Sequence, residues 1–325
     1  MNIAYMILAH NQPFQLKRLI DRLSQPNAYF YIHIDTKTKN IDFFRTTLAG
    51  YPNVTIIATC EVNWMGYTTI DAELDLMNLA YNSGVKFKYY VLMSGQDYPI
   101  KDNDYINNFF NSHTNDFISY TNLDFISEAM KNKIRQYHFR DIPYINPRNP
   151  KKIPVLVYLY FGSHKYLMKL LPRRNFYKNF VPYFGSQWFA LTHDTISYII
   201  DFVKNNPGYV RSMKFTDGPD EMFFHTIILN SERKTNVYDY SKYSDWLKIR
   251  KDNEVFTAGF TSLRYMDWSE RGKSKPAVLD ESYYEILLKS KELYGRKFDE
   301  KISAGLMDRI DTAILHRKET GVVKD

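Results

Sequence analysis

Residues 28–35 have the sequence AYFYIHID, a continuous apolar run that ends in a carboxylate. Similar runs occupy residues 3–9 (IAYMILA), 54–58 (VTIIA) and 88–94 (KYYVLMS). Continuous runs of this length are typical of strands buried on both faces, as in parallel sheets. Between these runs, residues 13–23 and 69–82 carry apolar side chains at helical spacing. We therefore predict an α/β fold: an open, mostly parallel, twisted sheet with flanking helices.

Polar side chains follow several of these predicted strands directly. His10 follows the first strand, Asp35 ends the second, and Ser94-Gly95-Gln96-Asp97 ends the last. The carboxyl ends of parallel strands border the ligand crevice of an open α/β sheet. These residues are therefore candidates for ligand contacts, although they would also suit ordinary loops.

The remainder of the chain is less regular. Residues 116–120 predict a strand, and four prolines between Pro143 and Pro154 predict a loop. Helices are expected at the ranges 124–135, 219–230, 281–292 and 299–317. No repeat or flexible linker divides the sequence, so we expect a single domain over residues 1–325.

Composition and charge limit the function classes. The chain has 325 residues, of which 44% are hydrophobic and 24% charged, as in globular proteins. Cys60 is the only cysteine, which excludes an intramolecular disulfide and a cysteine metal cluster; we expect a reduced core thiol rather than a nucleophile. The net charge of +7 suits nucleic acid, an anionic membrane face or a phosphorylated small molecule. Because the basic residues form only short pairs, a nucleic-acid-binding arm is not expected.

Targeting signals are not evident in the sequence. The start, Met1-Asn2-Ile3, has no positive n-region, and no apolar run approaches the ~20 residues of a spanning helix. The longest candidate, residues 153–161, is about half that length. We expect a cytoplasmic protein, held peripherally at the cytoplasmic (inner) membrane by its charge.

The sequence lacks the glycine motifs that bind phosphate, and its candidate metal-ligand patterns are weak. The sequence contains neither G-x-x-x-x-G-K-[ST] nor G-x-G-x-x-G, and its eight histidines include no pair at i,i+4. Asp102-Asn103-Asp104 has the D-x-D form that many nucleotide-sugar enzymes use for a divalent cation. It immediately precedes an apolar helical pattern, so capping of a helix explains it more simply.

Two charged clusters remain as candidates for chemistry. Asp217-Gly218-Pro219-Asp220-Glu221 places three carboxylates at a predicted helix start, where mutual repulsion raises the proton affinity of at least one. Such a group can serve as a general base, and helix capping is the alternative. Arg296-Lys297, expected in a tight loop between two helices, can hold a diphosphate or simply neutralise a helix end.

Taken in order, these segments resemble glycosyltransferase family 14, which includes core-2/I-branching β-1,6-N-acetylglucosaminyltransferases and peptide O-xylosyltransferases. Eight segments carry the similarity: residues 7–10 (ILAH), 31–35 (YIHID), 62–67 (VNWMGY), 92–100 (LMSGQDYPI), 185–188 (GSQW), 219–221 (PDE), 263–268 (LRYMDW) and 296–299 (RKFD). The GSQW and RKF elements are closer to the xylosyltransferase and bacterial branches than to the mucin-branching one.

The resemblance implies a GT-A-like fold and inverting transfer of a sugar, N-acetylglucosamine or xylose, from a UDP-sugar to a hydroxyl of a glycan or lipid-linked glycan. It also implies that no cofactor or divalent metal is required. Three parts follow: residues 1–112 for the nucleotide sugar, 113–275 for the acceptor, and 276–325 for C-terminal helices with a diphosphate-binding loop.

The resemblance also implies roles for individual residues. Glu221 would be the catalytic base, and basic side chains would hold the diphosphate in place of a metal. By position, the diphosphate-binding residues are Arg296 and Lys297, the nucleotide-sugar residues are His10, Asp35, Trp64 and Asp97, and the acceptor residues are Trp188 and Trp268.

The Golgi members of this family carry a membrane anchor, a stem and disulfides that have no counterpart here. The resemblance therefore implies a bacterial cytoplasmic enzyme of surface-polysaccharide synthesis. The alternative is a non-catalytic module that binds glycan or nucleic acid, because positive charge and many tyrosines suit stacking and phosphate contacts. The acidic cluster would repel a polyanion, so no nucleic-acid partner is expected.

Overall fold

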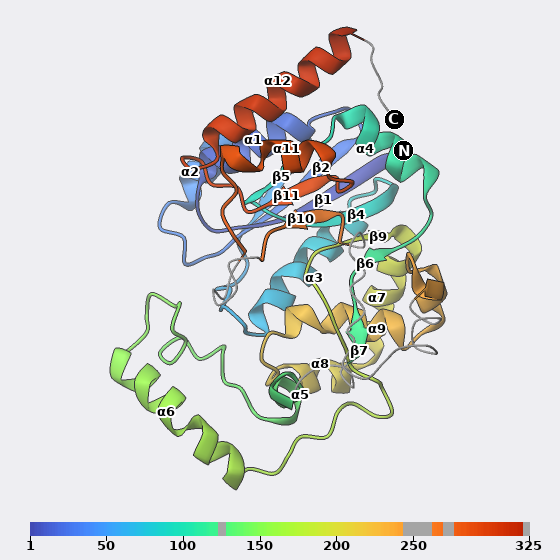
Figure 1. The fold of residues 1–325 in the computed structure, drawn as a ribbon. Coiled ribbons are helices and arrows are strands. Elements are labelled where there is room, and N and C mark those ends of the chain that lie inside the picture. The colour runs from blue at the N-terminus through green and yellow to red at the C-terminus, as the bar shows by residue number, and fades with distance from the viewer. Residues whose placement is uncertain (123–127, 243–261, 269–275, 321–325) are drawn as a thin grey trace.

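The structure is a computed structural model that describes residues 1–122, 128–242, 262–268 and 276–320. Its centre is a six-stranded sheet (Figure 1). In spatial order the strands are β3 (Val54–Ile57), β2 (Ala28–Ile34), β1 (Asn2–Ala9), β4 (Phe87–Ser94), β9 (Phe189–Thr192) and β6 (Phe117–Ile118). Strands β1 to β4 are parallel, and β9 is antiparallel to both β4 and β6. The predicted α/β fold with a mostly parallel sheet is confirmed, and its first four strands are correct to within one residue at each end.

The strand order reverses between β1 and β4. From β1 the chain adds β2 and β3 on one side, whereas β4 pairs with the other side of β1. In open α/β sheets such a reversal leaves a crevice outside the carboxyl ends of the strands. His10 follows β1 and Ser94 ends β4, so both residues lie at this crevice.

Helices cover both faces of the sheet because its apolar side chains alternate. Ile3, Tyr5 and Ile7 of β1 join one core, and Ala4 and Met6 join the other. The first core is closed by α1 (Pro13–Leu23) and α4 (Asn103–Ser112), and the second by α3 (Thr68–Tyr81), α7 (His193–Asn205) and α9 (Phe223–Leu229). Two short helices, α2 (Ile41–Thr47) and α8 (Pro207–Met213), complete these layers.

A second, three-stranded sheet carries the basic pair near the carboxyl end. Its order is β10 (Arg264–Met266), β11 (Tyr294–Arg296) and β5 (Asp97–Pro99). The prediction of a tight loop between two helices at this position was therefore wrong: Arg296 ends a strand, since Leu293 and Tyr294 are buried and the strand pairs on both sides. The three-part division of the chain stays a prediction.

The helices that flank β11 are shorter than predicted. The range 281–292 contains η4 (Glu281–Tyr283) and α11 (Tyr284–Lys289), and α12 (Ala304–Thr320) starts after residue 299. Asp299 accounts for the late start, because its Oδ1 accepts the backbone N–H groups of Lys301 and Ile302 in a separate turn. These helices enclose a third core around Tyr98 and Phe298.

The predicted helix over residues 219–230 is interrupted. A 3-10 turn, η2 (Pro219–Glu221), precedes α9, and Met222 between them has φ −141°. The carbonyl of Glu221 accepts a hydrogen bond from the backbone N–H of Gly185 at 2.8 Å, a long-range partner in place of the next helical turn. The break sets the acidic residues apart from α9.

The segment between β6 and β9 lies at one end of the molecule (Figure 1). It contains β7 (Thr121–Asn122), α5 (Glu128–Arg135), α6 (Pro154–Leu170) and β8 (Tyr183–Phe184), and η3 (Glu232–Asn236) follows α9. The proline-rich loop is confirmed, and so is a strand within residues 116–120. Of the helix predicted over residues 124–135, positions 124–127 lie outside the described residues. In the part of the chain that the structure describes, no helix is long and apolar enough to cross a bilayer.

Candidate active site

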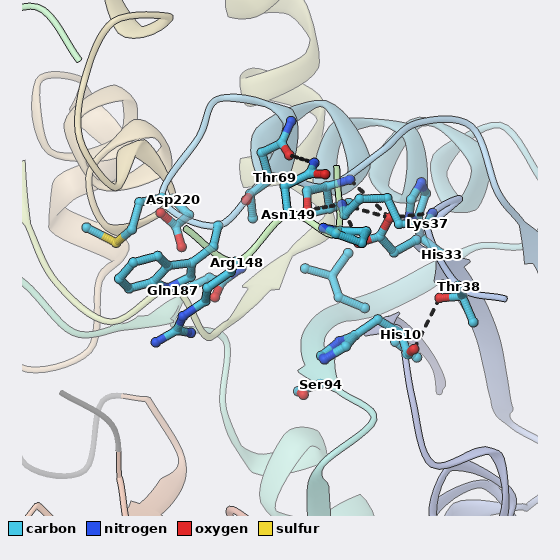
Figure 2. Close-up of a pocket in the computed structure, with 18 of the residues that line it drawn as sticks. His10, His33, Lys37, Thr38, Thr69, Ser94, Arg148, Asn149, Gln187 and Asp220 are labelled. Carbon is cyan, nitrogen blue, oxygen red and sulfur yellow. Dashed lines mark hydrogen bonds and ion pairs between the residues drawn. The ribbon is translucent and has the colours of Figure 1, made fainter. Parts of the chain in front are cut away.

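A cleft lies at the carboxyl ends of β1 and β4, where the two sheets meet. It has two connected lobes, with cavity volumes of about 390 Å³ and 820 Å³. Figure 2 shows the smaller lobe, with His10 and Ser94 on one side and Arg148, Gln187 and Asp220 on the other. Residues shared by both lobes are His10, Trp64, Met65, Ser94, Arg148, Gln187, Trp188, Asp220 and Arg296.

The larger lobe brings together the two charged clusters singled out from the sequence. Glu221 lines this lobe from η2, and Arg296 and Lys297 line it from the end of β11. The two clusters thus face one cavity although they come from distant parts of the chain. In such a cleft the carboxylate can accept a proton while the cationic pair binds an anionic group.

The cationic side is built on a buried carboxylate. Asp97, which is fully buried, accepts from Arg264 Nε at 2.8 Å and from Arg296 Nη1 at 3.0 Å. One negative charge therefore faces two guanidiniums, which leaves positive charge toward the cleft. Burial lowers the pKa of Arg296, and the charge of Asp97 opposes this shift. Asp97 is among the candidate nucleotide-sugar residues, but the structure places it behind Arg296 and not among the residues that line either lobe.

Trp188 supports Arg296 from the other side. The guanidinium carbon of Arg296 lies 4.5 Å from the centre of the Trp188 ring, within cation–π range. Trp188 is only 7% exposed, so its indole is chiefly a platform beneath the guanidinium, at the boundary of the two lobes. Trp268, in contrast, is 55% exposed and lines the larger lobe.

The acidic side consists of two neighbouring carboxyl groups rather than three. Asp217 forms an ion pair with Arg140 at 2.5 Å and is buried, which removes it from the predicted repulsion. Glu221 is half-buried, and its Oε2 lies 3.0 Å from Lys133 Nζ. Lys133 therefore neutralises and orients the Glu221 carboxylate in the resting site. The sequence did not indicate Lys133, because it lies on a separate helix, α5.

Asp220 is the titratable group of this pair. Burial, and next the negative charge of Glu221, raise the pKa of Asp220 to about 7. Its Oδ1 is buried and has no hydrogen-bond partner among the described residues. At neutral pH the two adjacent carboxyl groups therefore carry less than two full negative charges. The expected raised proton affinity falls on Asp220.

The smaller lobe holds the nucleotide-sugar candidates of the first strands. Asp35 pairs with Lys37 Nζ at 2.8 Å and accepts the backbone N–H of Lys37 at 2.9 Å. His10 lines both lobes; burial lowers its pKa, and the charge of Asp35 opposes that effect. Trp64 lines both lobes, and the Arg148 guanidinium lies 3.7 Å from its ring centre.

Sequence reasoning missed a loop that forms one wall of this lobe. Asn149 Nδ2 donates to Asn63 Oδ1 at 2.7 Å, and Asn146 Nδ2 donates to the carbonyl of Trp64 at 3.0 Å. These contacts fix Arg148 over Trp64. The repeated Asn in N-P-R-N-P was a local signal, because loops that depend on side-chain amides are rich in Asn.

A further missed contact lies under the junction of the lobes. Gln187 Nε2 donates to Glu73 Oε1 at 2.6 Å, and burial raises the pKa of Glu73 well above its usual range. Glu73 is one of the few carboxyl groups inside the core, on α3. The buried acid holds the Gln187 amide, which lines the cleft.

The D-x-D string is a helix start, as predicted. Asp102 is the N-cap of α4, and its carboxylate accepts the backbone N–H of Tyr105 at 2.7 Å. Among the described residues, no group of three or more His, Cys, Asp or Glu side chains is placed to hold a metal ion. Metal independence stays a prediction.

Cys60 is half-buried beside His33, and burial raises its thiol pKa to about 11. A thiol with a raised pKa is a poor nucleophile at neutral pH.

Comparison with known proteins identifies the family to which the chain belongs. The model of the family "Core-2/I-Branching enzyme" matches residues 3–287, and the chain belongs to this family. The resemblance to glycosyltransferase family 14 is thereby confirmed.

Individual relatives are more distant. Xylosyltransferase 2 of Pan troglodytes is 24% identical over 317 residues, which are 95% of this chain and 33% of the relative. The human "Probable beta-1,3-galactosyl-O-glycosyl-glycoprotein beta-1,6-N-acetylglucosaminyltransferase 7" is 28% identical over 176 residues, 51% of this chain and 41% of the relative. The chain thus spans about a third of the length of xylosyltransferase 2.

Among solved structures, S. aureus TarS residues 1–349 give a TM-score of 0.28 at 10% identity, covering 73% of this chain and 74% of that one. That score is too low for a shared fold to be inferred from it.

Proposed function

We propose that the chain is an inverting glycosyltransferase that moves a sugar from a UDP-sugar to a hydroxyl of a glycan acceptor. The observation that carries the proposal is the shared cleft, which is lined by Glu221 from η2 and by Arg296 and Lys297 from the end of β11. Membership of the Core-2/I-Branching family supports it. The names of the relatives favour N-acetylglucosamine or xylose as the donated sugar.

The carboxylate and the cationic pair suit the two ends of a single displacement. The acceptor oxygen attacks the anomeric carbon while its proton passes to the Glu221 carboxylate, and the bond from that carbon to the UDP oxygen breaks on the opposite face. A general base of this kind contributes roughly 10²–10⁴-fold. Lys133 holds the Glu221 carboxylate in place before the acceptor binds.

Negative charge gathers on the departing UDP, and fixed cations on that side stabilise it. We assign this role to Arg296, held by Asp97 and Trp188, and to the neighbouring Lys297. Asp97 is then a positioning residue for the guanidinium and does not touch the donor itself. In this proposal the two cations replace a divalent metal.

The smaller lobe receives the nucleoside in this proposal. His10, Asp35 and Trp64 border it, and Arg148 extends over Trp64. Trp268, which is largely exposed, lines the larger lobe, and we assign it to the acceptor. A GT-A-like arrangement, an acceptor glycan of a surface polysaccharide and a cytoplasmic location belong to the same proposal.

A UDP-release assay across a panel of UDP-sugars tests this function, because slow donor hydrolysis needs no acceptor. We expect release from UDP-N-acetylglucosamine or UDP-xylose, and unchanged release in excess EDTA. Loss of release in EDTA with recovery on adding Mn²⁺ would remove the metal-free part of the proposal. Absence of release and of binding for every UDP-sugar would remove the donor class.

A further inference from the structure

Helix α6 carries an apolar surface that the rest of the described chain leaves uncovered. Ten of the 22 large hydrophobic side chains exposed in the described residues lie between residues 153 and 171. On α6, Val155, Leu159, Tyr166 and Leu170 fall on one face at helical spacing and are 59%, 55%, 67% and 83% exposed. An exposed apolar patch of this extent marks an interaction site.

The opposite face of α6 attaches the helix to the protein. Tyr160 Oη accepts the backbone N–H of Phe139 at 3.2 Å, His164 Nε2 lies 3.1 Å from the carbonyl oxygen of Tyr137, and Met168 is only 8% exposed. These residues repeat every four positions, so one side of the helix is held and the other faces away. Figure 1 shows α6 at the edge of the molecule, far from the central sheet. The fold therefore leaves the apolar face of α6 exposed to solvent.

The charge of the surrounding sequence indicates what covers this face. Residues 142–193 contain eight Lys and Arg residues and no Asp or Glu. The whole chain has 43 Lys and Arg, 36 Asp and Glu, and a net charge of +7. Without this segment the chain would carry a charge of about −1, so the segment accounts for the entire positive charge. Lys152 before α6 and Arg173 and Lys178 after it are exposed.

We propose that α6 lies flat on an anionic lipid bilayer, with its exposed apolar face in the headgroup region and the neighbouring basic residues on the lipid charge. Helices with one apolar face and neighbouring basic residues bind in this way, with the apolar face buried about 5–10 Å deep. The 17 residues of α6 span about 25 Å along such a surface. A second protein surface would need acidic groups to match the segment, whereas an anionic bilayer supplies them continuously.

The position of α6 also links the bilayer to the cleft. The loop that carries Arg148 and Asn149, which walls the smaller lobe, leads directly into α6. Docking therefore holds this wall near the membrane. If the proposed function is right, the arrangement suits an acceptor carried on a lipid, and this last step rests on that function.

Co-sedimentation with vesicles tests the docking without donor or acceptor, so its result is independent of the proposed function. Vesicles of phosphatidylcholine with 30 mol% phosphatidylglycerol should bind the protein, and pure phosphatidylcholine vesicles should bind it much more weakly. L159D should weaken binding roughly ten- to hundredfold by removing an apolar anchor. The double variant R173Q/K178Q should weaken binding by about fivefold for each charge removed. Added salt should also weaken binding, because it screens the lipid charge.

Two controls separate docking from loss of folding. Leu159 is exposed, so L159D should leave the circular dichroism spectrum and the unfolding midpoint unchanged. I302D, at a residue 57% exposed on another part of the molecule, should bind vesicles like the wild type. Equal binding to both vesicle types, or wild-type binding by L159D, would overturn the proposal. So would a dimer in sedimentation velocity that L159D dissociates, because a second copy would then cover the face.

Discussion

Replacement of Asp97 by Asn gives a quantitative test of how the cationic side of the cleft is built. Asp97 is fully buried and holds Arg264 at 2.8 Å and Arg296 at 3.0 Å, and the Arg264 side chain is itself fully buried. D97N keeps the size of the side chain but leaves two neighbouring guanidiniums without a counter-charge. Removing one partner of a buried ion pair costs about 3–5 kcal/mol, and we expect a loss of unfolding free energy in that range.

A matched control uses the same pair of residue types at the surface. Asp308 lies 2.7 Å from Arg18, and its side chain is 71% exposed. D308N should cost less than about 1 kcal/mol, because water screens exposed pairs. Urea unfolding of the wild type, D97N and D308N measures both numbers. If D97N loses no more than D308N, the Asp97 carboxylate does not organise the two guanidiniums, and its assignment as a positioning residue is wrong.

Three further predictions concern the cleft. K297M should raise the Kd for UDP about tenfold or more in isothermal titration calorimetry, while K289M, at an exposed lysine of α11, should leave it unchanged; equal values would remove Lys297 from the diphosphate site. K133M should lower kcat roughly 10- to 100-fold with little change in the Kd for UDP, since Glu221 loses its positioning partner at 3.0 Å; wild-type kcat would contradict this. Burial raises the pKa of Asp220 to about 7 from 3.8, so the folded state holds this proton more tightly and the stability that this group contributes is lost as the pH rises from about 4 to 7. Between pH 5 and 8 the change in unfolding free energy, measured by urea unfolding, should differ between the wild type and D220N by about 3 kcal/mol, and an identical change in both proteins would refute the shift.

The strands of the central sheet could be predicted from the sequence because burial on both faces produces continuous apolar runs. The segment around Arg296 could not, since three-residue strands such as β5, β10 and β11 are defined by their pairing partners rather than by a local pattern. The same limit explains the break after Glu221. A hydrogen bond from Gly185, far away in the sequence, ends the turn that local capping signals predicted to be a continuous helix.

The candidate site was predictable to the extent that its groups carry charge at strand or helix ends. His10, Glu221, Arg296 and Lys297 all line the cleft. The partners that hold such groups were not predictable, because Lys133 reaches Glu221 only through the packing of α5.

The uneven distribution of charge is also visible in the sequence, but not in adjacent basic pairs. Its signal is the complete lack of acidic residues over 142–193, which only a count over a long window shows.

The most direct test of the central claim measures UDP release and UDP affinity for the wild type and E221Q side by side. Glu221 and the two cations line the same cleft, but the account assigns UDP binding to the cations and proton acceptance to Glu221. It therefore predicts that E221Q binds UDP with a Kd within about twofold of the wild type and transfers sugar roughly 10²–10⁴-fold more slowly. Transfer by E221Q at close to the wild-type rate would contradict the account.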